Sequence, residues 1–218
     1  MIELVIFDAD GVLFDSVEAN IAYYNAIFGA IGEPPLSPTE EREGIYYAAV
    51  QMFERRAGAD LEKLARMKAV ARDLDSEPFF KLLRPPFELR PFMVELKRSY
   101  RLALATNRSA TVPALVDYLE LADIFEAIAS ARDKVRPKPA PDILELCIRR
   151  AGVEPQHAIY VGDSQIDREA ATAAGIRFIG VGHRVEHHHR IAALDELPAR
   201  LAAFAADSAG AATTSSSR

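Results

Sequence analysis

The chain has 218 residues, of which 50% are hydrophobic and 27% charged, and its formal net charge is −6 at pH 7. This composition is typical of a folded globular protein, and the negative charge argues against nonspecific nucleic-acid binding, which needs a basic surface. The single cysteine, Cys147, excludes an internal disulfide framework and a multi-cysteine metal site. No apolar stretch reaches the roughly 18 residues of a membrane-spanning helix, and no basic leader precedes the first apolar run, so we expect a cytoplasmic protein that does not enter membranes.

Five short apolar runs predict the strands of a buried parallel sheet. The first, residues 2–7, is rich in β-branched and aromatic side chains and ends at a turn sequence over residues 8–11. Similar runs recur at residues 101–106, 127–130, 158–162 and 178–182. Helical stretches lie between several of these runs, which is typical of βαβ units. The sequence therefore predicts the α/β class.

The segment between the first two predicted strands is too long for one crossover helix, since about 85 residues separate Asp15 from Arg101. Its apolar residues follow a helical period, and a proline pair at residues 85–86 closes it. We therefore expect an α/β core that carries an inserted helical cap. The last residues are rich in alanine, serine and threonine, so they are expected to form a tail without fixed structure. The expected division is a core of residues 1–15 and 87–206, a cap of 16–86 and a tail of 207–218.

Three helices are expected in the cap. The first covers residues 17–31 after an Asp15–Glu18 capping box. The second opens at Ser37, with proline and glutamate in its first turn, and should stop near Gly58. The third covers residues 61–74. The core of the cap is expected to include the side chains of Tyr46, Tyr47, Met52 and Phe53.

Ligands of parallel α/β sheets bind beyond the carboxyl ends of the strands, so we looked for polar residues there. Asp8 and Asp10 directly follow the first strand. Two carboxylates this close resist joint ionisation unless a cation is present, which suits a nucleophile with an acid/base partner, or a magnesium site. An ordinary Asx-type turn explains the same two residues.

Two further polar groups follow the next strands of the core. Thr106 and Asn107 could bind an anion at a helix start, or could simply cap that helix. Lys138 lies on a proline-rich connector before a helix that should begin near residues 141–142. A positioned ammonium could neutralise a carboxylate and a phosphoryl group, although a solvated basic loop is the alternative.

The last polar group, residues 162–167, follows the fourth strand. If a helix starts here, Asp163 and Asp167 lie one turn apart, where they could hold magnesium or simply stabilise the helix dipole. Each of these groups has an ordinary structural explanation. Together, however, acids, a lysine and a hydroxyl converge on one sheet edge, which favours phosphoryl transfer.

These stretches resemble the four ordered motifs of the haloacid dehalogenase-like hydrolase superfamily. The resemblance is carried by DADGVLFDS at 8–16, TN at 106–107, KPAPD at 138–142 and GDSQID at 162–167. The helical segment directly after the first motif resembles the subclass with a type 1 cap, typified by phosphoglycolate phosphatase and β-phosphoglucomutase. The resemblance implies a Rossmann-like parallel sheet with helices on both faces, an inserted all-helical cap, Mg²⁺ and an aspartyl-phosphate intermediate.

The resemblance also implies roles for individual residues. Asp8 would be the nucleophile, and Asp10 would protonate the leaving oxygen and then deprotonate water. Thr106, the backbone of Asn107 and Lys138 would bind the phosphoryl group. The metal would be held by Asp8, the carbonyl of Asp10, and Asp163, while Asp167 would either bind it through water or orient Lys138. Arg108 stands where many relatives have a small residue, and is expected to contact the substrate or to form a salt bridge to the cap.

The resulting expectation is a Mg²⁺-dependent phosphatase acting on a small phosphorylated metabolite. A sugar phosphomutase with the same core residues is the alternative, and a receiver domain or an inactive interaction protein fits the motifs less well. The histidines at 187–189 are expected in a solvated loop, and Cys147 in apolar packing. The substrate and the oligomeric state do not follow from the sequence.

Overall fold

The computed structural model describes residues 1–44 and 47–204. Its centre is a six-stranded, entirely parallel sheet of order β3-β2-β1-β4-β5-β6. The strands are β1 Leu4–Phe7, β2 Arg101–Thr106, β3 Ala127–Ser130, β4 Ala158–Gly162, β5 Arg177–Val181 and β6 Arg190–Ile191. The predicted α/β class is confirmed. The two-residue β6 was not predicted, because it is too short to show any periodicity.

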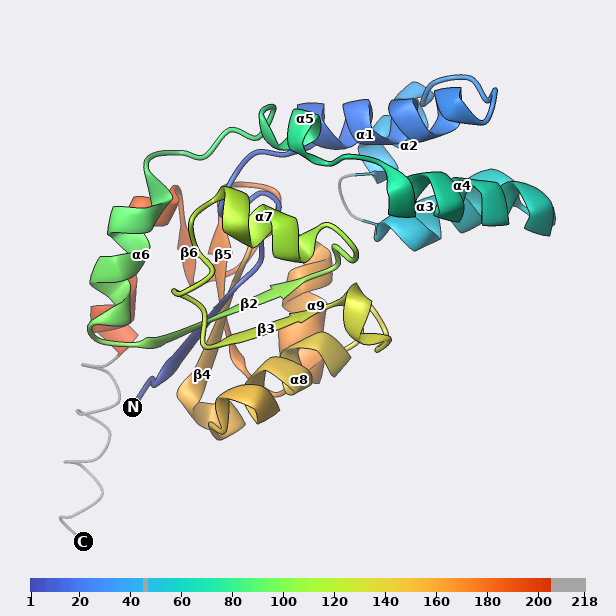
Figure 1. Cartoon of the computed structure of the whole chain (residues 1–218). Coiled ribbons are helices and arrows are strands. Elements are labelled where there is room, and N and C mark those ends of the chain that lie inside the picture. Colours follow the sequence, from blue (N-terminus) through green and yellow to red (C-terminus); the bar gives the residue numbers. More distant parts are fainter. Residues whose placement is uncertain (45–46, 205–218) are drawn as a thin grey trace, which may run out of the picture.

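Helices cover both faces of the sheet (Figure 1). They are α6 Leu89–Lys97, α7 Val112–Tyr118, α8 Asp142–Ala151 and α9 Gln165–Ala173, and residues 197–204 are also helical. Successive side chains of a strand point to opposite faces, so every residue of β1 is buried. Val5 and Phe7 pack with α6 and α7, whereas Leu4 and Ile6 pack with α8. This two-sided burial explains why the strands are continuous apolar runs.

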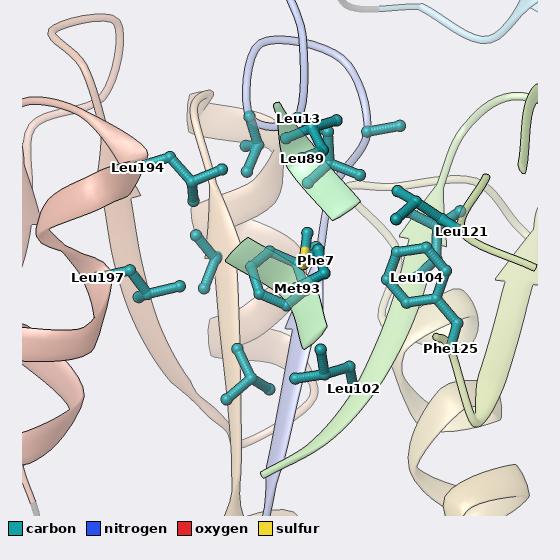
Figure 2. Close-up of a cluster of buried hydrophobic side chains, with 14 of the residues drawn as sticks. Phe7, Leu13, Leu89, Met93, Leu102, Leu104, Leu121, Phe125, Leu194 and Leu197 are labelled. Atoms are coloured by element: carbon teal, nitrogen blue, oxygen red, sulfur yellow. The ribbon is translucent and has the colours of Figure 1, made fainter. Parts of the chain in front are cut away.

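One hydrophobic cluster spans the face under α6 and α7 (Figure 2). Phe7 and Leu104 lie at its centre, with Met93 of α6 packed against them. The helical residues Leu194 and Leu197 extend the cluster toward the edge of the sheet. Phe7 is paired in register with Leu104 and Val161. The carboxyl ends of β1, β2 and β4 are therefore close to one another at the same edge of the sheet.

Between β1 and α6, the regular elements of the chain are all helices, and this segment lies beyond the carboxyl edge of the sheet (Figure 1). We call residues 16–86 the insert. Its helices are α1 Val17–Ala30, α2 Pro38–Glu43, α3 Ala49–Ala57, α4 Leu61–Asp73 and α5 Glu77–Phe80. They share a hydrophobic cluster of their own, which includes Phe28, Phe53 and Met67. Where the chain enters and leaves the insert, Asp15 and Arg84 exchange two backbone hydrogen bonds of 2.9 and 3.0 Å.

The helix predicted from Ser37 to Gly58 is wrong in its middle, because the chain forms α2 and α3 instead. Ser37 does form the predicted capping box with Glu40, and α3 does end at Gly58. Helix α2 ends at Glu43, and the next residue is Gly44, a residue type that weakens helix propagation by about 1 kcal/mol. A new helix then starts where the N–H of Ala48 donates to the side chain of Gln51 at 2.9 Å.

The predicted Asp15–Glu18 capping box is also absent. Helix α1 begins after Ser16, and the Asp15 carboxylate accepts a hydrogen bond from the N–H of Val17 at 3.0 Å. A capping box needs the N–H of Asp15, which already donates to the carbonyl of Arg84. The Glu18 carboxylate instead lies 3.2 Å from the Arg84 guanidinium.

The remaining predicted features concern single side chains, one loop and the tail. Met52, Phe53 and Cys147 are buried as expected, and the histidines at 187–189 lie in a loop. Tyr46 and the tail of 207–218 lie outside the described residues. Among residues 1–44 and 47–204, we find no helix with the length and hydrophobicity needed to cross a membrane.

Candidate active site

A cleft lined by residues of both the carboxyl edge of the sheet and the insert lies between them. All of the residues predicted to form the site line it, namely Asp8, Asp10, Thr106, Asn107, Arg108, Lys138, Asp163 and Asp167. They lie at or directly after the carboxyl ends of β1, β2 and β4, on the connector before α8, or, for Asp167, in the first turn of α9. Convergence of distant segments is what the parallel sheet imposes, because the carboxyl ends of its strands meet at one edge.

Lys138 is the cation at the bottom of the cleft, and its side chain is only 3% exposed. Its Nζ lies 2.8 Å from Oδ1 of Asp8 and 2.7 Å from Oδ1 of Asp167. It also donates a hydrogen bond of 2.6 Å to the hydroxyl of Tyr160, which in turn donates to Asp167 at 2.8 Å. Burial lowers the pKa of a lysine, but the two carboxylates outweigh it and raise the pKa of Lys138. The ammonium is therefore charged and fixed against Asp8.

Three buried carboxylates meet beside this ammonium. Asp8, Asp163 and Asp167 each offer an oxygen within 4.8 Å of the others. Burial raises the pKa of Asp8 well above its usual range, although Lys138 opposes the shift. Burial and the nearby Asp167 raise the pKa of Asp163 to about 7. Lys138, together with Arg184 at 3.0 Å from Asp163, carries fewer positive charges than the three carboxylates carry negative ones when ionised, and a divalent cation would complete the balance.

The backbone near these carboxylates leaves room for them. Gly11 has a φ of +76°, and a Cβ at this position would lie 2.0 Å from Oδ2 of Asp163. Only a residue without a side chain lets the turn after β1 approach Asp163 this closely. Hard oxygen ligands in such a cluster fit Mg²⁺, so the donor set agrees with the predicted metal.

Asp10 has different surroundings from Asp8. Its two carboxylate oxygens each accept a hydrogen bond of 2.7 Å from the guanidinium of Arg108, in a bidentate pair. Arg108 Nη2 also donates to Oδ1 of Asn20 on α1 at 3.0 Å, so this pair joins the core edge to the insert. Burial raises the pKa of Asp10, but the charge and hydrogen bonds of Arg108 outweigh it and hold the pKa below its usual value. Arg108 is thus linked to the insert by a hydrogen bond to the neutral Asn20, whereas its salt bridge is with Asp10 of the core and not with the insert.

Thr106 and Asn107 lie at the end of β2, but not at a helix start as the sequence suggested. Helix α7 begins only at Val112. The Thr106 hydroxyl accepts a hydrogen bond of 3.1 Å from the N–H of Arg108, which turns the chain toward the cleft. The Asn107 amide accepts from the N–H of Lys138 at 2.8 Å and donates to its carbonyl at 3.1 Å. Its side chain therefore fixes the connector that carries Lys138.

The sequence suggested that Asp163 and Asp167 lie one turn apart on the same helix. In the structure, however, Asp163 precedes α9 and only Asp167 belongs to the helix. Ser164 is the N-cap of this helix, and its hydroxyl accepts a hydrogen bond from the N–H of Asp167 at 3.2 Å. Asp163 instead forms an ion pair of 3.0 Å with Arg184 in the loop after β5. Asp167 was expected either to bind the metal through water or to orient Lys138. In the structure, Oδ1 of Asp167 contacts the Lys138 ammonium.

Sequence reasoning missed four polar residues around the site: Asn20, Tyr160, Ser164 and Arg184. Tyr160 stands inside an apolar strand, where its hydroxyl carries no sequence signal. Arg184 and Asn20 reach the site from loops or helices outside the motifs. Ser164 had a signal, since serine followed three residues later by an aspartate resembles a capping box.

The model of the haloacid dehalogenase-like hydrolase family matches residues 5–181. The chain belongs to this family. Among curated relatives, the hydrolase is 31% identical over 193 residues to the phosphoglycolate phosphatase of Pseudomonas putida, covering 84% of this chain and 71% of that protein. The predicted superfamily and the prediction of an enzyme are therefore confirmed.

Solved structures agree with this assignment. The hydrolase superposes on CbbY from Rhodobacter sphaeroides, crystallised with phosphate, with a TM-score of 0.72 and 28% identity, covering 90% of this chain and 96% of that one. It shares its fold with β-phosphoglucomutase from Clostridium difficile, with a TM-score of 0.73 and 16% identity, covering 94% of this chain and all of that one. The Rossmann-like fold expected from the resemblance is confirmed.

Proposed function

We propose that this hydrolase is a Mg²⁺-dependent phosphatase that cleaves a small phosphomonoester through an aspartyl-phosphate on Asp8. The observation that carries the proposal is the pair of aspartates after β1. Asp8 contacts the Lys138 ammonium at 2.8 Å, whereas Asp10 is held separately by Arg108. One carboxylate is thus placed beside a cation that could also bind a phosphoryl group, and the other is free of that cation. Relatives named phosphoglycolate phosphatase support the same reaction class.

In the first step, a carboxylate oxygen of Asp8 forms a bond to phosphorus while the bond from phosphorus to the ester oxygen breaks. Asp10 gives its proton to the departing ester oxygen, which leaves as the alcohol. The contact with Arg108 favours the ionised form of Asp10. Binding of the substrate must therefore weaken that contact before Asp10 can act as an acid.

In the second step, water attacks the phosphorus of the aspartyl-phosphate. Asp10, now ionised, takes a proton from this water, and Asp8 departs as a carboxylate together with inorganic phosphate. Arg108 stabilises the form of Asp10 that this step requires. We assign Arg108 to positioning Asp10, and not to binding the phosphoryl group.

The remaining residues bind the phosphoryl group and the metal. We assign the Thr106 hydroxyl, the backbone N–H of Asn107 and the Lys138 ammonium to the phosphoryl oxygens. Mg²⁺ would be held by Asp8, the carbonyl of Asp10, and Asp163, with Asp167 orienting Lys138. When bound, the ion supplies positive charge that offsets the repulsion between these carboxylates and an anionic ester.

We further propose that the insert is a separate cap domain of residues 16–86 on a core of 1–15 and 87–206. Its aromatic side chains line the cleft opposite the carboxylates, so it would shield the intermediate from excess water. A cytoplasmic location belongs to the same proposal, because phosphorylated metabolites are anions that do not cross a bilayer unaided.

The test is release of inorganic phosphate from a panel of phosphorylated metabolites by the full chain. We expect turnover with Mg²⁺, loss of turnover with EDTA, and recovery when Mg²⁺ is restored in excess. Turnover that EDTA does not affect would contradict the metal assignment. A hexose 1-phosphate distinguishes the two reactions: we expect free phosphate, whereas formation of the 6-phosphate would support a mutase.

A further inference from the structure

The insert side of the cleft is uncharged among the residues that the structure describes. It consists of small residues, Asn20, Leu83 and a group of aromatic side chains. The aromatic residues are Tyr23, Tyr24, Tyr47, Phe79 and Phe80. All of the charged side chains that line the described cleft come from the core.

The cations on the core side are already engaged. The lining contains four carboxylates but only two cations, Lys138 and Arg108. Lys138 contacts Asp8 and Asp167 at 2.8 and 2.7 Å. Arg108 uses two of its nitrogens on Asp10. Within the described part of the cleft, therefore, every lining cation is committed to a carboxylate of the site.

Tyr23 and Phe79 form an aromatic pair on the insert side. Their ring centroids lie 5.6 Å apart with an interplanar angle of 86°, and both side chains are half-buried. Tyr24 packs edge-on against Tyr23, with their ring centroids 5.7 Å apart, and thereby helps to fix the Tyr23 ring. Burial raises the pKa of Tyr23, so its hydroxyl is neutral at physiological pH. Both residues line the same cleft as Asp8 and Lys138, so the pair presents an uncharged aromatic surface to the cleft.

We infer that the substrate is a phosphomonoester of an uncharged alcohol that carries a ring. A second anionic group on the alcohol would enter a partly dry cleft without a partner, and burial of an unpaired carboxylate is costly. A ring, by contrast, would pack against Tyr23 and Phe79 in the edge-to-face or offset geometry that aromatic pairs prefer. The inference rests on the proposed phosphatase function, and it separates this chain from relatives named for phosphoglycolate, whose alcohol bears a carboxylate.

The experiment compares esters that differ by one charge. We measure kcat/KM of the full chain with Mg²⁺ for benzyl phosphate, for its para-carboxylate analogue and for 2-phosphoglycolate. The two benzyl esters have similar leaving groups, so their ratio reports the effect of the carboxylate. We expect benzyl phosphate to be favoured by about tenfold or more over both anionic esters. Equal or faster turnover of either anionic ester would overturn the inference while leaving the phosphatase function intact.

Failure of the proposed function has a different signature. If no ester of the panel releases phosphate, then the phosphatase proposal itself is contradicted and the inference falls with it. Circular dichroism of the same sample verifies that the chain is folded.

Variants of the insert side identify the cause of the preference. Ser76 lines the cleft and makes no side-chain capping bond, so Ser76→Arg places a cation there with little structural cost. We expect this change to shift the ratio of kcat/KM for the two benzyl esters toward the carboxylated one by about tenfold, and Ser76→Gln to shift it by less than about twofold.

A second variant tests the contact with the ring. Phe79→Ala should lower kcat/KM for benzyl phosphate by about tenfold more than for methyl phosphate, which has no ring. A ratio that does not respond to Ser76→Arg, or equal losses on both esters in Phe79→Ala, would overturn the inference.

Discussion

Two aspartates separated by one residue have opposite environments in this molecule. Asp8 is crowded by Asp163 and Asp167, and burial raises its pKa, whereas the guanidinium of Arg108 lowers the pKa of Asp10 despite its burial. Such divergence between neighbouring carboxyls is what separates a nucleophile from an acid/base in active sites. The difference comes from their partners, since both residues are aspartates in the turn that follows β1.

Asp8→Asn tests the nucleophile at the residue scale. The amide cannot attack phosphorus, so we expect turnover of an aryl phosphate to fall to the background rate. The change also removes one charge from a crowded cluster, and Lys138 keeps its contact with Asp167 at 2.7 Å. Thermal unfolding should therefore show a folded protein, with a midpoint at or above that of the wild type. Residual turnover well above the background would remove the assignment.

Arg108 offers a second test at this scale. Arg108→Ala leaves the Asp10 carboxylate without its bidentate partner, so we expect kcat to fall by about 10²-fold or more, which is the size of a lost acid/base contribution. Arg108→Lys keeps the charge but not the planar pair of donors, and should recover only part of the loss. Steady-state kinetics separates this role from substrate binding. A large rise in KM with unchanged kcat would show that Arg108 binds substrate instead.

At the scale of single elements, the turn after β1 is the most constrained. A methyl group on Gly11 would overlap Oδ2 of Asp163, whereas Gly32 has a similar φ of +80° and open space around it. Both positions disfavour an alanine through the backbone, at about 1–2 kcal/mol. They differ only in what the new side chain meets.

We therefore expect Gly11→Ala to lose most activity and Gly32→Ala to keep it. Both variants should lower the free energy of unfolding by a similar backbone contribution, and Gly11→Ala should show a further loss from the overlap with Asp163. Activity assays and chemical denaturation measure the two effects. An active Gly11→Ala protein would mean that Asp163 can move without harm to the reaction.

The elements also show why some of the structure was predictable. Buried parallel strands must be apolar on both faces, so their runs predicted β2, β3 and β4 with the observed bounds. Parallel alignment then brings Asp8, Thr106 and Asp163 to one edge, and this convergence followed from the strands alone. The break between α2 and α3 was not predictable, because Gly44 changes helix stability by about as much as tertiary contacts do. Equally, no local pattern pairs Arg108 with Asp10, because 98 residues separate them.

At the scale of the whole molecule, the buried apolar side chains of residues 1–44 and 47–204 form three clusters, of which two cover the faces of the sheet and one lies within the insert. The insert cluster contains Met67, and the sheet cluster under α6 contains Met93; both side chains are fully buried. If the insert is a domain of its own, then a cavity in one cluster should loosen that part of the chain first.

We expect Met67→Ala to lower local stability by about 2–5 kcal/mol and to speed amide hydrogen exchange in α1, α3 and α4, with little effect on β1 and β4. Met93→Ala is the matched change in the core, and should speed exchange in the sheet. Equal loss of protection in the sheet and the insert upon Met67→Ala would show that the two unfold as one unit.

The most direct measurement is to identify the phosphorylated residue. The Asp10→Asn variant, which cannot deprotonate the attacking water, is mixed with 4-nitrophenyl phosphate and Mg²⁺, quenched in acid and examined by intact-protein and peptide mass spectrometry. The nitrophenolate of this ester leaves without a proton, so the first step does not need Asp10. The proposed mechanism predicts that one phosphoryl group accumulates on the enzyme, on the peptide that contains Asp8, and that the Asp8→Asn, Asp10→Asn double variant carries none. A phosphoryl group on any other residue, or the same amount of label in the double variant, would contradict the mechanism.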